Sequence, residues 1–147
     1  MSSKILFISV LILTFFNHTL FAETLNVKKL SGSWHLRALD GNEVRKARAI
    51  LEFDGQSMKI SGFDGCNSIN GLLTLDPQTK NYHSSALRTT RMACRGNIQR
   101  YVHQKIHNTL ESSFIIRKEK KYGIEGITIK SSKHSLFFKR MGKDSWF

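Results

Sequence analysis

The chain contains two cysteines, Cys66 and Cys94, whose thiols can form a disulfide bond or act as a redox pair. An even cysteine pair in a small exported domain most simply forms a disulfide bond, which restricts the unfolded chain and stabilises the fold by about 3 to 4 kcal/mol. The alternative is an exchangeable redox pair, but the Cys-x-x-Cys spacing that lowers a thiol pKa is absent. We therefore predict a structural disulfide between Cys66 and Cys94.

A second pair with possible chemistry is His103 and His107, which stand one helical turn apart and could share a metal ion. The zinc-protease motif needs a glutamate directly after the first histidine, whereas this chain has Gln104 there. Both histidines also lie on the flank of an apolar helical stripe, where solvated polar side chains are expected. We therefore predict no metal site and no cofactor.

Other signatures of catalysis are absent from the sequence. No Gly-x-Ser-x-Gly elbow presents a serine nucleophile, and no glycine loop is followed by Lys-Ser or Lys-Thr to hold phosphate. Three further histidines, His35, His83 and His134, are isolated in strand-like segments with no nucleophile beside them. We predict no catalytic residue, so an enzyme is the less favoured class.

Three arginines, Arg88, Arg91 and Arg95, flank the second cysteine within a segment from Pro77 to Leu110 that holds no acidic residue. Guanidinium groups suit bidentate binding of phosphate or carboxylate. We predict a candidate anion-binding site here, for an anionic lipid or an acidic protein, with generic surface charge as the competing interpretation.

Residues 1–22 have the pattern of a secretory signal peptide. Lys4 supplies the positive start, and the apolar stretch from Ile5 to Phe16 is shorter than the roughly 20 residues that a membrane-spanning helix needs. We expect cleavage after Ala22. The mature protein is then periplasmic or secreted, and soluble, with no second apolar run long enough to anchor it.

The remaining residues, 23–147, suit a single domain with one hydrophobic core. The formal net charge of the chain is +12, and Lys4 is the only charged residue that leaves with the signal peptide. This balance favours anionic partners. Nucleic acid is disfavoured because export separates the chain from it.

Alternating apolar and polar residues predict about eight short strands. In the clearest case Ala49, Leu51 and Phe53 share one face, and Asp54-Gly55-Gln56 supplies the turn that follows. Short strands at such spacing favour a sandwich or an open barrel. The predicted strands cover residues 34–39, 49–54, 58–61, 69–75, 82–87, 114–118, 124–130 and 136–140.

One segment departs from the strand pattern, between Gly96 and Leu110. Its apolar residues recur at helical spacing and predict one amphipathic helix whose stripe packs against a sheet face. The stripe consists of Ile98, Tyr101, Val102, Ile106 and Leu110. One helix among so many strands makes the fold class mainly β.

Two blocks of the chain carry a family resemblance. The first contains Gly65-Cys66-Asn67 and the second is Thr90-Arg91-Met92-Ala93-Cys94. Together with Trp34-His35-Leu36 and the strand and helix order, they make nearly the whole mature chain resemble the META domain of HslJ-like proteins. The residues that match the family motif are Gly62, Gly65, Cys66, Asn67, Gly71, Thr90, Met92, Ala93 and Cys94.

The resemblance implies a small antiparallel curved sheet or open barrel of about eight strands with one packed α-helix. It also implies a bacterial envelope protein linked to heat shock, envelope stress and drug tolerance, without established enzymatic activity. The chain departs from the family pattern at Leu73, where many members carry an aromatic residue, and at Asn97 and Gln99, where many carry an acid early in the helix. It also lacks the cysteine for lipid attachment that many bacterial members have, so a lipid tether is not expected. In the first block, we expect Asn67 to cap a turn through its side chain.

These observations favour a non-enzymatic periplasmic binding or stress-protective module for an anionic lipid or an acidic protein. The alternatives are an uncharacterised hydrolase or metal-dependent enzyme, and an inhibitor or accessory subunit of an envelope protein. An apolar cleft beside Arg88, Arg91 and Arg95 would favour the binding module, whereas an exposed apolar patch would favour the accessory subunit.

Overall fold

The computed structural model of the protein describes residues 24–142, so the predicted signal peptide and its cleavage site after Ala22 lie outside the described residues. The described chain forms nine strands, two short 3-10 helices and one α-helix. In chain order the elements are η1 (Val27–Lys29), β1 (Gly32–Leu39), β2 (Asn42–Glu43), η2 (Arg45–Ala47), β3 (Ile50–Asp54), β4 (Lys59–Phe63), β5 (Ser68–Leu75), β6 (Tyr82–Thr89), α1 (Asn97–Leu110), β7 (Phe114–Lys121), β8 (Ile124–Ser131) and β9 (Ser135–Arg140).

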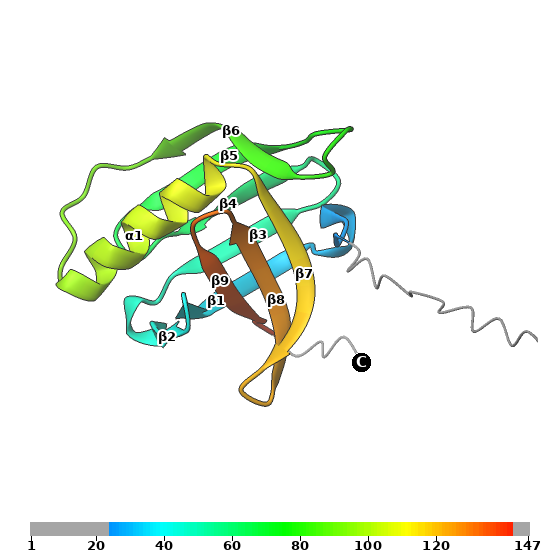
Figure 1. The fold of residues 1–147 in the computed structure, drawn as a ribbon. Coiled ribbons are helices and arrows are strands. Elements are labelled where there is room, and N and C mark those ends of the chain that lie inside the picture. The colour runs from blue at the N-terminus through cyan, green and yellow to red at the C-terminus, as the bar shows by residue number, and fades with distance from the viewer. Residues whose placement is uncertain (1–23, 143–147) are drawn as a thin grey trace, which may run out of the picture.

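All the strands belong to one antiparallel sheet that curves back on itself (Figure 1). The strand order is β2-β1-β3-β4-β5-β6-β7-β8-β9, and β1 also pairs with β9. The junction between β6 and β7 is the weakest in the ring, since its ladder holds the single pair Tyr82 and Phe114. The predicted class, a mainly β fold with a strongly curved sheet, is confirmed.

The alternation seen in the sequence determines which side of the sheet each residue faces. Leu51 and Phe53 in β3 are buried, whereas Glu52 between them is exposed. In β4, Ile60 is buried next to the exposed Lys59. Side chains of this buried set from all parts of the ring form one hydrophobic core on the inner side of the sheet.

Helix α1 lies against the inner side of the curved sheet (Figure 1). Val102, Ile106 and Leu110 are fully buried in the same core as the sheet residues, as the helical spacing predicts. Tyr101, expected in the same stripe, is 37% exposed at its edge. The helix is thereby held at a fixed rotation about its axis, which decides where its polar side chains point.

One loop is shaped by a close approach between neighbouring backbones. Gly62 in β4 has φ +144°, and a Cβ atom built there would lie 2.1 Å from the carbonyl oxygen of Ile50 in β3. Only glycine fits this contact, because a side chain would have to displace backbone. The chain then leaves the sheet at Phe63 and enters the loop that carries the first cysteine.

Candidate functional site

The loop after β4 is organised around the carboxylate of Asp64, which is fully buried. Its Oδ1 atom accepts hydrogen bonds from the amides of Cys66 at 2.9 Å and Asn67 at 2.8 Å. The Asp64 amide donates to the carbonyl of Asn67, which closes the turn. Gly65 between them has φ +100°, a conformation that favours glycine.

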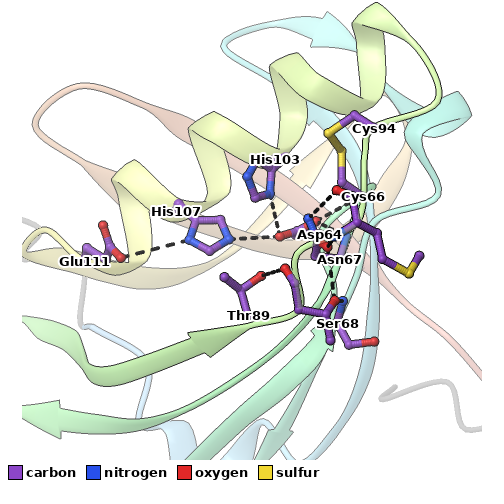
Figure 2. A network of polar contacts seen from close by, with 11 residues as sticks. Asp64, Cys66, Asn67, Ser68, Thr89, Cys94, His103, His107 and Glu111 are labelled. Carbon is purple, nitrogen blue, oxygen red and sulfur yellow. Dashed lines mark hydrogen bonds and ion pairs between the residues drawn. A yellow bond between two sulfur atoms is a disulfide. The ribbon is translucent and has the colours of Figure 1, made fainter.

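A disulfide joins this loop to the segment that precedes α1. Cys66 and Cys94 are bonded, and their Cα atoms lie 4.8 Å apart. The sulfur bridge lies beside the Asp64 carboxylate (Figure 2). The predicted pairing of the two cysteines is therefore present in the structure.

The side chain of Asn67 links the two motif blocks directly. Its Oδ1 accepts from the Met92 amide at 2.6 Å and from the Thr90 hydroxyl at 3.0 Å. Its Nδ2 donates to the Met92 carbonyl at 3.4 Å. The expectation that Asn67 caps a local turn is wrong, since its partners lie on a distant segment. The bonds explain why Gly-Cys-Asn and Thr-x-Met-Ala-Cys occur together.

The second oxygen of Asp64 meets two histidines from α1, as Figure 2 shows. Asp64 Oδ2 lies 2.7 Å from His103 Nδ1 and 2.9 Å from His107 Nε2. The side chains of His103 and His107 are 25% and 15% exposed. On the outer side, His107 Nδ1 faces Glu111 Oε1 at 4.0 Å.

These contacts determine the charge of Asp64. Burial raises the pKa of the Asp64 carboxyl, but hydrogen bonds from His107, from the amides of Asn67 and Cys66, and from His103 outweigh burial and lower that pKa to about 2. The group is therefore a carboxylate at neutral pH. It can anchor α1 to the loop, and with the two imidazoles it offers the three ligand atoms of a metal site.

The histidines therefore do not occupy the place expected from the sequence. They were predicted to be solvated on the helix flank, whereas both are partly buried and bonded to Asp64. No local spacing reveals this contact, because Asp64 precedes His103 by 39 residues. The one feature of the sequence that could have indicated the contact is Asp64, an acidic residue inside the glycine-rich first motif block.

The remaining histidines have unrelated surroundings. His134 Nδ1 lies 2.9 Å from Asp40 Oδ2, in the turn before β9. Burial and the nearby Arg37 charge lower the pKa of His35 in β1. His83 in β6 is exposed. Among residues 24–142, no serine, threonine or cysteine side chain is hydrogen-bonded to a histidine ring, and the absence of catalysis stays a prediction.

A groove of about 640 Å³ lies across β1, β3, β4, β5 and β6 on the side of the sheet away from the core. Exposed side chains of these strands line it, among them Leu72, which is 47% exposed. More of the groove surface is apolar than polar. The position follows from strand alternation, since Lys59 and Leu72 point outward next to buried Ile60 and Leu73.

A β-bulge forms one wall of the groove. The β5–β6 register runs from Asn70 opposite Arg88 to Leu72 opposite Ser85, so β6 has an extra residue at this point. Ala86 within the bulge has φ +52°, in the left-handed region that alanine rarely adopts. Such a bulge bends the strand and redirects its side chains. Ala86 and Arg88 consequently both line the groove.

The charged groups of the groove differ in whether they are already engaged. Glu52 accepts a hydrogen bond from the Ser33 hydroxyl. Asp54 accepts from the hydroxyl and amide of Ser57 and the amide of Gln56, and these bonds lower the pKa of its carboxyl. The side chains of Lys59 and Arg88, by contrast, form no hydrogen bond or ion pair in the described part of the chain, although the Lys59 charge contributes to the lowered pKa of the Asp54 carboxyl.

The three arginines predicted from the sequence to bind an anion lie in two different places in the structure. Arg88 lines the groove, whereas Arg91 and Arg95 lie outside its lining on the exposed loop between β6 and α1. The expected apolar cleft beside all three arginines is not found among the described residues, because the groove lies beside Arg88 alone and combines exposed Leu72 with mostly polar side chains. Anion binding by all three arginines stays a prediction.

One further observation concerns membranes. Within residues 24–142, no helix has the length and apolar character needed to cross a bilayer.

Comparison with known proteins gives a family and a fold. An NMR structure of a protein from Burkholderia xenovorans superposes with a TM-score of 0.60 at 22% identity, covering 80% of this chain and 87% of that one. A second protein, also solved by NMR, gives a TM-score of 0.62 at 20% identity, covering 79% and 95%. No curated protein matches the sequence. The META domain model matches residues 25–142, nearly all of the described chain, and this chain belongs to the META domain family.

Proposed function

We propose that this META-domain protein is a non-enzymatic binding module of the bacterial cell envelope, and that its outer groove holds an anionic amphiphile such as an acidic lipid. The observation that carries the proposal is the pair of cations, Lys59 and Arg88, which line the groove beside exposed Leu72, while the groove carboxylates accept hydrogen bonds from neighbouring residues. An apolar surface beside free cationic groups complements a ligand with a hydrocarbon part and a phosphate.

The shape of the groove supports its assignment as a ligand-binding site. The surrounding strand pairing holds Ala86 in a strained backbone conformation, and such strained residues cluster at binding sites. Exposed Leu72 gives the ligand's apolar part a surface to cover. The acidic protein considered from the sequence is the competing occupant, and the exposed Leu72 side chain between the two cations favours the lipid.

The location in the envelope rests on two features. Residues 1–22 have the pattern of a signal peptide, and the domain contains a disulfide, which persists in oxidising compartments. The proposal of a binding role without catalysis is supported by the lack of any nucleophile bonded to a histidine ring among the described residues. A link to envelope stress follows from the family resemblance.

The test is calorimetric titration of the mature, oxidised protein with dioctanoyl phosphatidylglycerol below its micelle concentration. Dioctanoyl phosphatidylcholine has the same chains and no net charge, and serves as the ligand control. We expect saturable binding of the anionic lipid that weakens as ionic strength rises. Equal binding of both lipids, or no binding of either, would overturn the proposal.

Variants locate the site. Replacing both Lys59→Gln and Arg88→Gln should weaken binding of the anionic lipid by about tenfold or more, a loss of about 1.4 kcal/mol or greater. Arg117→Gln, an exposed arginine in β7 outside the groove, is the matched control and should have no effect. A third variant, Arg91→Gln with Arg95→Gln, tests whether the site extends to the loop. Loss of binding in this loop variant alone would place the anion site outside the groove.

A further inference from the structure

Three potential metal ligands converge at the junction of α1 and the motif loop. The carboxylate of Asp64, Nδ1 of His103 and Nε2 of His107 all lie within 4.8 Å of one another. The two histidines share one face of α1 because they are four residues apart. Asp64 comes from a loop held by the disulfide. We propose that Asp64, His103 and His107 form a binding site for a divalent transition-metal ion, with Zn²⁺ as the reference ion.

The donor set fits this class of ion. Two imidazole nitrogens and one carboxylate oxygen are ligands that Zn²⁺ accepts at about 2.0 to 2.2 Å. Ligand atoms around a tetrahedral ion at such distances are about 3.3 Å apart, and here Asp64 Oδ2 lies 2.7 and 2.9 Å from the two ring nitrogens. Binding of the ion therefore requires the two ring nitrogens to move about half an ångström away from Asp64 Oδ2.

The surroundings of Asp64 place metal-ligand side chains beside it. The carboxylate is fully buried, and within residues 24–142 the groups paired with it are the two histidines of α1, with no lysine or arginine among them. A buried carboxylate is normally paired or coordinates a metal, and imidazoles are themselves ligands for transition metals. Oδ1 is occupied by the amides of Cys66 and Asn67, and Oδ2 alone faces the histidines. The same carboxylate is thereby oriented with one oxygen ready to act as a ligand.

The site can be reached from solvent. His103 and His107 keep 25% and 15% of their side chains exposed. Metal-bound histidines commonly direct their second ring nitrogen to a carboxylate, which orients the ring. The carboxylate nearest the second nitrogen of His107 is that of Glu111, with Nδ1 and Oε1 4.0 Å apart, which is longer than a hydrogen bond. The site is separate from the lipid groove, whose lining includes none of these residues.

The test uses full-length mature protein without an affinity tag, stripped with EDTA and titrated with ZnCl₂ by calorimetry. Co²⁺ in a parallel titration reports geometry, because a four-coordinate ion gives stronger visible absorption bands than the hydrated ion. We expect one Zn²⁺ per chain and four-coordinate Co²⁺ bands. His103→Gln with His107→Gln should weaken Zn²⁺ binding at least about a hundredfold, as loss of two of three ligands requires.

The chain offers a matched control. His134 Nδ1 lies 2.9 Å from Asp40 Oδ2, the same kind of pair without a second histidine, so His134→Gln should leave Zn²⁺ affinity unchanged. Because the histidines of α1 are partly exposed, the double variant should fold, and circular dichroism with a thiol assay checks this. If it does not fold, His103→Gln alone replaces it. Binding without one-to-one saturation, or equal binding by the wild type and the α1 histidine variant, would overturn the proposal.

Discussion

At the scale of single residues, Asp64 does the most to organise the motif loop. One of its oxygens accepts two backbone amides and the other contacts both α1 histidines. Because all the donors favour the ionised form, its pKa of about 2 lies below the ordinary value of 3.8. A carboxyl whose pKa is lowered on folding stabilises the fold above its unfolded pKa, and this contribution is lost as the pH falls.

The first prediction follows from this direction of the pH dependence. In metal-free protein, Asp64 should contribute about 2 kcal/mol to the free energy of unfolding at pH 7, and this contribution should disappear between about pH 4 and pH 2. Asp64→Asn lacks the titrating group, so its stability should fall less steeply over this range. Urea unfolding of both proteins at several pH values measures the difference, and parallel pH profiles would contradict the assignment.

The second prediction concerns the bulge residue Ala86, whose φ is +52°. A β-branched side chain is poorly tolerated in this left-handed region, so Ala86→Val should lower the free energy of unfolding by about 1 to 2 kcal/mol, although valine favours strands elsewhere. His83→Val, an exposed position in the same strand and three residues from Ala86, is the control and should be nearly neutral. Chemical denaturation measures both. Equal stability of the two variants would mean that the strain at Ala86 does not shape the groove wall.

At the scale of elements, the disulfide and Asn67 hold the motif loop to the segment before α1. The two cysteines are 28 residues apart in sequence, so their bond removes a sizeable loop-closure entropy from the unfolded chain. We predict that Cys66→Ala with Cys94→Ala lowers the free energy of unfolding by about 3 kcal/mol. Guanidinium denaturation of the oxidised and variant proteins measures this. A loss below about 1 kcal/mol would mean that Asn67 and Asp64 hold the loop without the bridge.

Elements were predictable where their pattern is strong. The helix and most strands follow directly from apolar periodicity, because the inner side of the sheet excludes water along its whole length. β2 has two exposed residues and no apolar pattern, so it could not be found. β7 continues to Lys121, three residues past its predicted end, since its last residues are charged and face solvent. Backbone pairing with β8 holds them in the strand.

The candidate sites were less predictable than the fold. The cysteine pairing followed from composition and compartment, and Arg88 was singled out from the run without acidic residues. The contact between Asp64 and the α1 histidines depends on how the helix rotates against the sheet, which the apolar stripe constrains only roughly. The bulge at Ala86 could not be predicted from the sequence, because residues in the left-handed region are usually glycine or asparagine.

At the scale of the whole molecule, the described residues form one sheet that closes on itself through the pairing of β1 with β9. Among residues 24–142, the weakest junction of the ring is the single pair between β6 and β7. The ladders that join the groove strands β1 and β3 to β6 to one another hold several pairs each. A groove preformed by such pairing needs little ordering when a ligand binds.

Export of the protein to the periplasm can be tested directly. In a bacterial host, the mature protein should begin at Glu23 and be recovered oxidised from the periplasmic fraction. Intact mass spectrometry after osmotic shock reads both the amino terminus and the loss of two hydrogen atoms that accompanies oxidation of Cys66 and Cys94 to a disulfide. A full-length, reduced protein in the cytoplasmic fraction would contradict the proposed location and remove the argument for an envelope lipid.

The most direct measurement of the central claim is NMR chemical-shift mapping of ¹⁵N-labelled mature protein titrated with dioctanoyl phosphatidylglycerol. The account predicts saturable shifts of the amides of Ser61, Asn70 and Ala86 on the groove strands, with the amides of α1 unaffected. Shifts confined to the loop of Arg91 and Arg95, or spread over the whole surface, would contradict a lipid site in the groove.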